Sequence, residues 1–145
     1  MYAFAVSVDI EASPARVWRA LCDPAEVVQW DAGVVEALDA PVGYPRPGQH
    51  VRWRYSNGPF RLLHDRPQEV APERCLRSRL SLGPFRFDET HTIEPSGDGC
   101  RLSTQMTVRA PLPGLGWAVG RLYVGPESRR SVEASLQAIK RHCES

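Results

Sequence analysis

Residues 2–18 read YAFAVSVDIEASPARVW, a strand pattern followed directly by a helix start. From Tyr2 to Glu11, aromatic and branched residues alternate with small or polar ones, which predicts a strand with one buried face. Ser13 and Pro14 then supply an N-cap and a first-turn proline for a short helix that ends at residues 23–24. The stretch therefore predicts an N-terminal strand that passes almost at once into a helix.

The chain between residues 24 and 108 predicts an antiparallel meander. A second short helix is expected over residues 24–30 and a proline-rich loop over 41–48. Alternating segments separated by short turns pair with their neighbours in the antiparallel direction. Strands are expected over residues 33–38, 50–56, from 60 to a bulge or sheet edge at Pro67, and over 76–82, 85–93 and 102–108, with a tight hairpin turn at Asn57-Gly58.

After Pro111 the apolar period changes from two to about 3.6, which indicates a long C-terminal helix. The helix pattern is clearest over residues 127–142. Gly125-Pro126 is expected to kink or break the helix, and the pattern leaves its continuity through Pro126 open. The fold class is thus α+β: a helix-grip arrangement of six to seven curved antiparallel strands around a long C-terminal helix, with two short helices after the first strand.

Composition limits the classes of function. The chain has 145 residues, so one domain over residues 1–145 is expected, and 18 basic against 17 acidic residues argue against a nucleic-acid partner. No apolar run is long enough for stable membrane insertion, and the N-terminal residues lack the features of a signal peptide, so a cytoplasmic location is expected. The four cysteines form no CxxC pair, which disfavours a zinc or redox site and predicts reduced, packed thiols.

Residues from Val6 to Trp18, followed by Leu21-Cys22-Asp23-Pro24 and Trp30, resemble the START-like (SRPBCC) superfamily. The nearest branch is the polyketide cyclase/dehydrase and lipid-transport group, related to plant Bet v 1-type proteins. The turn from Gly97 to Leu102 is similar to a Gly-Asp-Gly-Thr hairpin of that group, with Cys100 in place of Thr. The resemblance covers the whole chain and implies the helix-grip fold. It implies no single activity, because the superfamily includes carriers, receptors, cyclases and chaperone activators.

A curved sheet around one helix leaves space that side chains do not easily fill, so an apolar small-molecule ligand is the expected partner. The strand alternation places an aromatic-rich wall with a few polar groups on the inner face. The predicted ligand-binding residues are Trp53, Tyr55, Leu62, His64, Ser78, Leu80, Phe87, Glu89, His91, Thr104 and Met106 on the sheet, and Trp117, Leu122 and Tyr123 on the helix. Many of these residues could instead simply pack on one another.

Four of the inward residues are candidate catalytic groups: His91, Glu89, His64 and Tyr55. Glu89 and His91 are two apart on one predicted strand, so both project to the same side, roughly 7 Å apart. A histidine beside a carboxylate can act as a general acid or base, as an aldol-type cyclisation or dehydration requires, with Tyr55 or His64 as a proton donor. His64, His91 and Glu89 also form a possible metal-ligand set, but nothing fixes their convergence, so neither a metal nor a cofactor is expected.

Three functions remain open at this point. The first is a carrier or sensor that binds an apolar or aromatic ligand. The second is a polyketide cyclase/dehydratase-like enzyme that uses the four polar residues. The third is an interaction module with a vestigial pocket, in which the outward arginines or a dimer contact would act. The chain is expected to be a monomer or a homodimer.

Overall fold

The computed structural model describes residues 2–109 and 123–145. The elements follow the predicted order closely, and the predicted boundaries differ from the observed ones by a few residues. They are β1 (Tyr2–Ile10), α1 (Pro14–Cys22), α2 (Pro24–Trp30), β2 (Val34–Ala37), β3 (Val51–Tyr55), β4 (Leu62–Ala71), β5 (Cys75–Leu82), β6 (Phe85–Ser96), β7 (Gly99–Arg109) and α4 (Gly125–Glu144).

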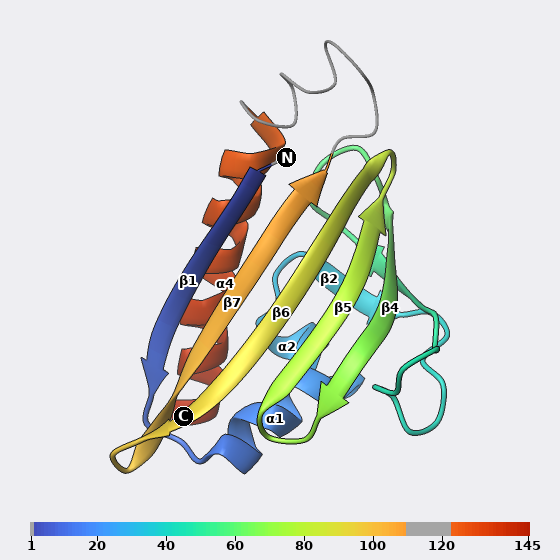
Figure 1. Cartoon of the computed structure of the whole chain (residues 1–145). Helices are drawn as coiled ribbons and strands as arrows, with labels where there is room; N and C mark the ends of the chain where they lie inside the picture. Colours follow the sequence, from blue (N-terminus) through green and yellow to red (C-terminus); the bar gives the residue numbers. More distant parts are fainter. Residues whose placement is uncertain (1, 110–122) are drawn as a thin grey trace.

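In the described ranges, seven strands form one antiparallel sheet in the order β1-β7-β6-β5-β4-β3-β2. Strands β2 to β7 pair in the order of the sequence, and the first strand, β1, pairs with the last strand, β7. The long helix α4 lies along β1 and β7 on the inner face of the curved sheet, and α1 and α2 pack against it at one end (Figure 1). This is the helix-grip fold, as the sequence predicts.

The two short helices are fixed by side-chain caps. The Ser13 hydroxyl accepts a hydrogen bond from the Arg16 amide at 3.1 Å, and Asp23 accepts one from the Ala25 amide at 2.9 Å. Each helix also has a proline in its first turn, where the missing N–H has no partner to lose. The caps therefore explain why α1 and α2 are separate helices that meet at Asp23.

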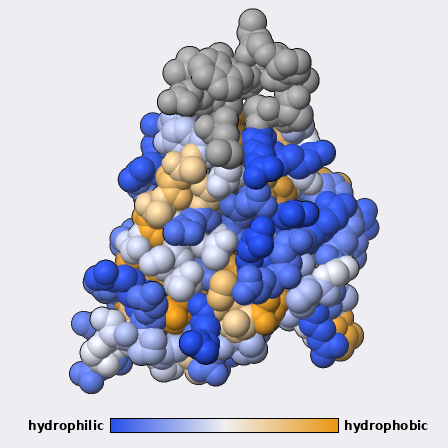
Figure 2. All heavy atoms as spheres, in the orientation of Figure 1, coloured by the Kyte–Doolittle hydropathy of each residue, from blue (hydrophilic) through white to orange (hydrophobic). Residues whose placement is uncertain are grey.

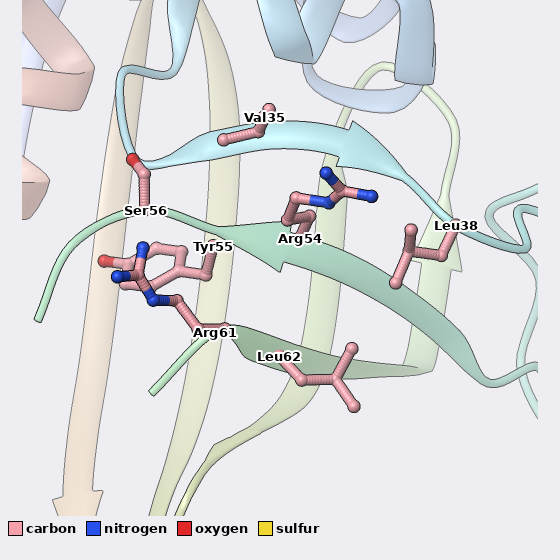
Figure 3. A pocket seen from close by; sticks show the side chains of 7 residues that line it. All are labelled: Val35, Leu38, Arg54, Tyr55, Ser56, Arg61 and Leu62. Atoms are coloured by element: carbon pink, nitrogen blue, oxygen red, sulfur yellow. The ribbon is translucent and has the colours of Figure 1, made fainter. Parts of the chain in front are cut away.

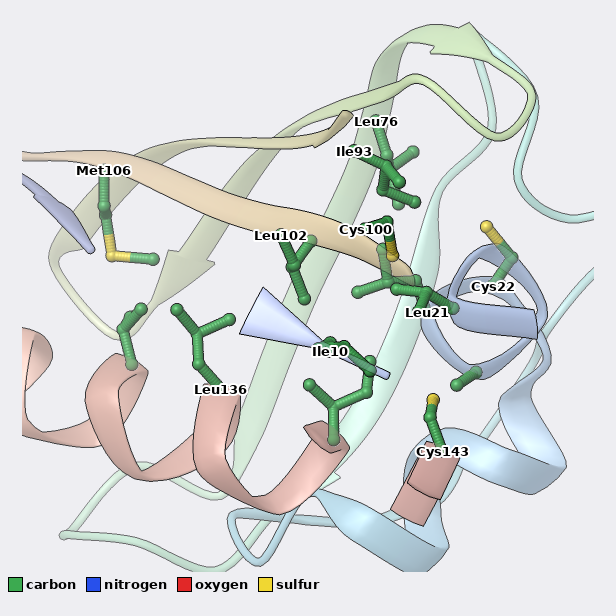
Figure 4. Packing of buried hydrophobic residues seen from close by; sticks show 14 of the residues in the cluster. Ile10, Leu21, Cys22, Leu76, Ile93, Cys100, Leu102, Met106, Leu136 and Cys143 are labelled. Atoms are coloured by element: carbon green, nitrogen blue, oxygen red, sulfur yellow. The ribbon is translucent and has the colours of Figure 1, made fainter. Parts of the chain in front are cut away.

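The main core lies between α4, α1 and the inner face of β1, β7 and β6 (Figure 4). Leu102 and Ile139 are fully buried there, and each comes from an apolar stripe that the sequence pattern predicts. All four cysteines are free, and Cys22, Cys100 and Cys143 are buried among the apolar residues. A smaller cluster around Trp53 and Val51 joins α2, β2 and β3.

The phase of β4 differs from the prediction by one residue. A tight turn at Asn57-Gly58 would pair Trp53 with Leu62, whereas the observed pairs are Trp53 with Leu63 and Val51 with Asp65. The connection runs through residues 56–61, and its length moves the register by one position. A one-residue shift turns every side chain to the other face, so Leu62 and His64 lie on the outer face, and the prediction for them is wrong. Pro67 does lie at a bulge, as predicted.

Helix α4 runs from Gly125 to Glu144 with Pro126 in its first turn. The predicted kink or break at Gly125-Pro126 depends on the chain before residue 123, which lies outside the described residues. Gly125 lies against the aromatic ring of Tyr2, and a β-carbon at position 125 would be 2.4 Å from Cγ of that ring. Trp117 and Leu122, predicted to contact a ligand, lie outside the described residues. Tyr123 is described and is 72% exposed, so the expected inward orientation of its side chain is wrong.

The outer face of the sheet is polar, and hydrophilic side chains cover much of it (Figure 2). The arginines predicted to point outward are exposed, and several pair with carboxylates, as Arg101 does with Asp9 at 2.9 Å and Arg52 with Asp39 at 2.7 Å. Such exposed pairs contribute little to stability. Among the helices that the structure describes, none has the length and apolarity needed to cross a bilayer.

Candidate functional site

Three polar side chains form a hydrogen-bonded chain at the middle of the inner face. Glu89 and His91 are two apart on β6, and Thr104 lies directly opposite His91 on β7. Nε2 of His91 is 3.0 Å from Oε1 of Glu89, and Nδ1 of His91 is 2.8 Å from Oγ1 of Thr104. Both nitrogens of the imidazole are therefore engaged. Among the described residues, His91 is the hydrogen-bond partner of Glu89 through Oε1, and Oε2 receives no hydrogen bond from another described residue.

The two charged partners favour each other's ionised form. Burial alone would raise the pKa of Glu89, but the His91 charge and hydrogen bond outweigh it, and the pKa lies below its usual value of 4.5. Burial likewise would lower the pKa of His91, but the Glu89 carboxylate raises it above its usual 6.5. The pair is thus an ion pair over a wider pH range than free groups would form.

A second polar cluster is centred on Asp65 of β4, which β5 separates from β6 in the sheet. Oδ2 of Asp65 accepts hydrogen bonds from the Tyr44 hydroxyl at 2.5 Å and from Nε1 of Trp53 at 3.2 Å. Oδ1 of Asp65 is buried without a hydrogen-bond partner among the described residues. Burial raises the pKa of Asp65, and it raises the pKa of Tyr44 well above its usual value of 10.0. Tyr44 comes from the loop before β3, which this hydrogen bond ties to the sheet.

A third carboxyl group completes the acidic character of the inner face. Asp31, at the end of α2, accepts a hydrogen bond from the Gly33 amide at 3.0 Å. Burial raises the pKa of Asp31, and the Glu89 charge raises it further. Although burial opposes protonation of His91, the charges of Glu89, Asp65 and Asp31 all raise the pKa of that imidazole. Three carboxyl groups therefore act on one histidine.

Exposure along the inner face separates two regions. On β7, which α4 covers, Leu102 and Thr104 are completely buried. On β6, one strand further from α4, the side chains of Glu89 and His91 keep 19% and 15% of their exposure, and Phe87 is also only partly buried. Leu80 on β5 and Tyr55 on β3 are partly exposed in the same way. The polar chain thus lies where described side chains leave the sheet incompletely covered.

A family model matches almost the whole chain. The model described as polyketide cyclase / dehydrase and lipid transport matches residues 1–144. The chain belongs to this family. A search of curated proteins finds no match.

Solved structures share the fold of this family member at low sequence identity. Protein CV1439 from Chromobacterium violaceum superposes with a TM-score of 0.79 at 19% identity, over 99% of this chain and 98% of that one. A START superfamily protein from Mycobacterium smegmatis gives 0.77 at 17% identity, over 99% and 98%. The protein TTHA0849 from Thermus thermophilus gives 0.73 at 21% identity, over 97% and 96%. At these identities the likeness concerns the fold alone.

Of the sheet residues predicted to line the site, Leu62 and His64 lie on the outer face. The others form a buried group and a partly exposed group. Trp53 is 4% exposed, packs in the smaller core and donates a hydrogen bond to Asp65. The partly exposed predicted residues on the inner side are Tyr55, Leu80, Phe87, Glu89 and His91, and the buried ones are Trp53, Ser78, Thr104 and Met106. The sequence pattern therefore found most of the inner face but did not separate packed from accessible positions.

His64 does not join the other polar residues. It stacks on His50 on the outer face, with Nδ1 of His64 2.7 Å from Nε2 of His50. Burial and the charges of neighbouring basic residues lower the pKa of His64. The possible metal set of His64, His91 and Glu89 is therefore divided between the two faces. Among the described residues, no group of three or more metal-ligating side chains comes together.

Tyr44 and Asp65 are two residues of the polar cluster that are not among the predicted site residues. Tyr44 lies in a proline-rich loop without periodicity, so no pattern indicates that its hydroxyl reaches the sheet. Asp65 carried a signal: with the register moved by one residue, it becomes an inward carboxylate opposite Val51. The inward orientation of the Asp65 carboxylate could have been predicted only with the correct length of the connection between β3 and β4.

A separate groove lies at the edge formed by β2, β3 and β4 (Figure 3). It has a volume of about 350 Å³, and Leu62 and Arg54 lie side by side in it on neighbouring strands. Tyr55 lines the same groove, so this predicted site residue is at the margin of the inner face. The other lining residues are Val35, Leu38, Ser56 and Arg61.

Proposed function

We propose that this domain binds an apolar or aromatic small molecule between the inner face of the sheet and α4, as a carrier or sensor. The observation that carries the proposal is the partial exposure of Phe87, Glu89 and His91 at the centre of the sheet. Central positions of a sheet that is covered by a helix are normally close-packed. Side chains that stay accessible there favour a space that a guest molecule occupies.

The position of the helices supports the same proposal. α4 packs mainly against β1, and α2 packs against β2 at the opposite edge. The described helices thus cover the two sides of the inner face, whereas in the middle, where β5 and β6 lie, the main helix contact is that of α1 with β6 (Figure 1). The accessible residues named there are the apolar Leu80 and Phe87 and the polar Glu89 and His91. Apolar side chains combined with a few polar groups are typical of a small-molecule site.

Native mass spectrometry of freshly purified protein tests the proposal, because a resident ligand adds a defined mass to the intact chain. The matched variants are Leu80→Trp, which fills the inner face, and Ser81→Trp, the next residue on β5, which pairs with His64 on the outer face. Leu80→Trp is expected to remove the co-purified mass or the uptake of an added naphthalene probe, and Ser81→Trp is expected to retain it. Equal uptake by both variants would contradict an inner-face site.

The second candidate function is a cyclase/dehydratase-type enzyme, and the polar chain on β6 favours it. Glu89 has a carboxylate oxygen that no described residue engages, next to a histidine that supports its charge. In an intramolecular aldol step, this oxygen would take a proton from a carbon beside one carbonyl. The resulting enolate carbon would bond to a second carbonyl carbon of the same molecule. The new alkoxide would take up a proton, and loss of water would leave an unsaturated ring.

Hydrogen exchange at a diketone probe in deuterated water separates the two candidates. An enzyme is expected to speed the exchange of protons beside the carbonyl, and Glu89→Gln is expected to abolish the acceleration because an amide is not a base. A carrier is expected to bind the probe without exchange. Glu94→Gln on the same strand is the control, since Glu94 is exposed to solvent.

A further inference from the structure

The inner face holds an acceptor that the protein itself leaves open. Oε1 of Glu89 is bonded to His91, but Oε2 receives no hydrogen bond from another described residue. The Glu89 side chain is 19% exposed, and the strand alternation places it on the same face of β6 as the core residue Ile93. A partly buried carboxylate oxygen gains most from a donor, because water reaches it poorly.

His91 does not compete for this role. Its two ring nitrogens are fixed by Glu89 and Thr104, and Thr104 is fully buried. The imidazole therefore sets the direction of the Glu89 carboxylate, so that the open oxygen has a defined position. His91 is a positioning residue, whereas Glu89 presents Oε2 to the space on the inner side of β6.

The charges around this oxygen select the ligand's chemistry. Asp31 and Asp65 lie close enough to Glu89 for its charge to raise the pKa of both carboxyl groups, in addition to their burial. The inner face thus carries three carboxyl groups, those of Glu89, Asp31 and Asp65, and one imidazole, that of His91. A ligand carboxylate at the same place would meet repulsion, whereas a hydroxyl or a protonated nitrogen would be attracted.

From these contacts we infer that the ligand is an apolar molecule whose inner end carries a hydrogen-bond donor, a hydroxyl or a protonated amine, and that it donates to Oε2 of Glu89. This inference rests on the proposed binding function and specifies its ligand class. Ligands whose buried end is a carboxylate, such as ionised fatty acids in a head-first orientation, are disfavoured by the same arrangement. The apolar remainder of the ligand lies against Phe87 and Leu80 on the neighbouring pair of strands.

Four naphthalene probes test the inference: the parent hydrocarbon and derivatives with a hydroxyl, an aminomethyl or a carboxylate group. Equilibrium dialysis at neutral pH gives a dissociation constant for each. The hydroxyl or the aminomethyl probe is expected to bind about tenfold or more tightly than the carboxylate, the effect of one hydrogen bond to a charged group. The ratio of the hydroxyl to the aminomethyl probe shows whether the donor is neutral or cationic.

Glu89→Gln separates this contact from general packing. The variant is expected to lose the preference for the aminomethyl over the carboxylate probe, measured as the ratio of the two dissociation constants, whatever its affinity for the parent hydrocarbon. Glu94→Gln, exposed on the same strand, is expected to keep the wild-type order. If all four probes bind the wild type equally, or the carboxylate binds best, the inference is overturned while the proposed binding function stands. If none binds, the binding function fails, and the inference fails with it.

Discussion

Nε2 of His91 lies 3.0 Å from Oε1 of Glu89, and the other ring nitrogen lies 2.8 Å from Thr104. The histidine is therefore held on both sides, and the carboxylate is held on one. Sequence alternation alone predicts that Glu89 and His91 share a face, but it leaves open which of the two contacts the ligand. Because Thr104 on β7 occupies the second ring nitrogen of His91, Glu89 is the residue of the pair that we propose to contact the ligand.

The first prediction concerns the pH dependence of this pair. The raised pKa of His91 means that its contribution to stability is complete below 6.5 and is lost as the pH rises through the pKa of the folded state. The lowered pKa of Glu89 means that its contribution is complete above 4.5 and is lost as the pH falls through its folded-state value. The pair is thus most stabilising between 4.5 and 6.5.

His91→Gln should consequently destabilise the fold more near pH 5.5 than near pH 9, by about 1–3 kcal/mol at the lower pH. Urea unfolding of wild type and variant at both values measures the difference. The carboxyls of Asp31 and Asp65 also face the pair, and their raised pKa values give both proteins a common loss of stability as the pH rises above 3.8. An equal destabilisation at both pH values would show that His91 acts only through its volume.

Much of the fold could be predicted because its signals are local. Each signal can be read from residues that are close together in the sequence. Examples are the alternation from Tyr2 to Ile10, the cap at Ser13 and the change of period before α4. Such signals depend on the chain's own period and caps, so distant contacts do not alter them. The order of the elements then left few topologies for the sheet, since sequential short connections pair neighbouring strands.

The site was harder to predict because it depends on one connection. The turn after Tyr55 determines whether Leu62 or Leu63 lies opposite Trp53, and therefore whether His64 or Asp65 faces inward. A composition such as Asn57-Gly58 indicates a turn but not its length. The contact of Tyr44 with Asp65 depends on a loop that reaches across 21 positions of sequence, for which periodicity carries no information.

The second prediction separates the charge of Asp65 from its hydrogen bonds. Asp65→Asn keeps an oxygen for Tyr44 and Trp53 but removes a buried charge, so it should flatten the pH dependence of stability above pH 3.8. Asp65→Ala removes the acceptor as well and should cost about 1–3 kcal/mol, because two buried donors lose their partner. Tyr44→Phe removes one of these donors and serves as the control. A destabilisation by Asn as large as that by Ala would mean that the charge itself is required.

The third prediction concerns thiol reactivity. Burial, together with a smaller effect of the Asp65 charge, raises the pKa of Cys22 to about 12. The pKa values of Cys75, Cys100 and Cys143 are raised as well, mainly by burial. Since the thiolate is the reactive form, native protein should react slowly with iodoacetamide near pH 8, and Cys75 should react first because it is the least buried.

Peptide mapping by mass spectrometry after timed labelling identifies the order of reaction. Protein unfolded in urea is the control, in which all four thiols should react at similar rates. Rapid labelling of Cys22 in the native protein would contradict the packing of α1 against the sheet.

The fourth prediction tests the contact that joins the start of α4 to β1. A β-carbon at Gly125 would lie 2.4 Å from Cγ of Tyr2, closer than packed atoms approach. Gly125→Ala should therefore destabilise the fold by about 1–3 kcal/mol, as overpacking does. Tyr2→Ala removes the ring that causes the clash, so the double variant should be more stable than the sum of the single effects predicts, by at least about 0.5 kcal/mol.

The matched control combines Tyr2→Ala with Gly97→Asn. Gly97 lies in the turn between β6 and β7, at the opposite end of the sheet from Tyr2, and a β-carbon there meets no atom within 4 Å. Its positive φ of 57° suits asparagine, so this pair should be additive. Additivity in both cycles would show that Gly125 is required for the backbone of the helix start rather than for the approach of Tyr2, because only a shared contact makes the two substitutions compensate each other.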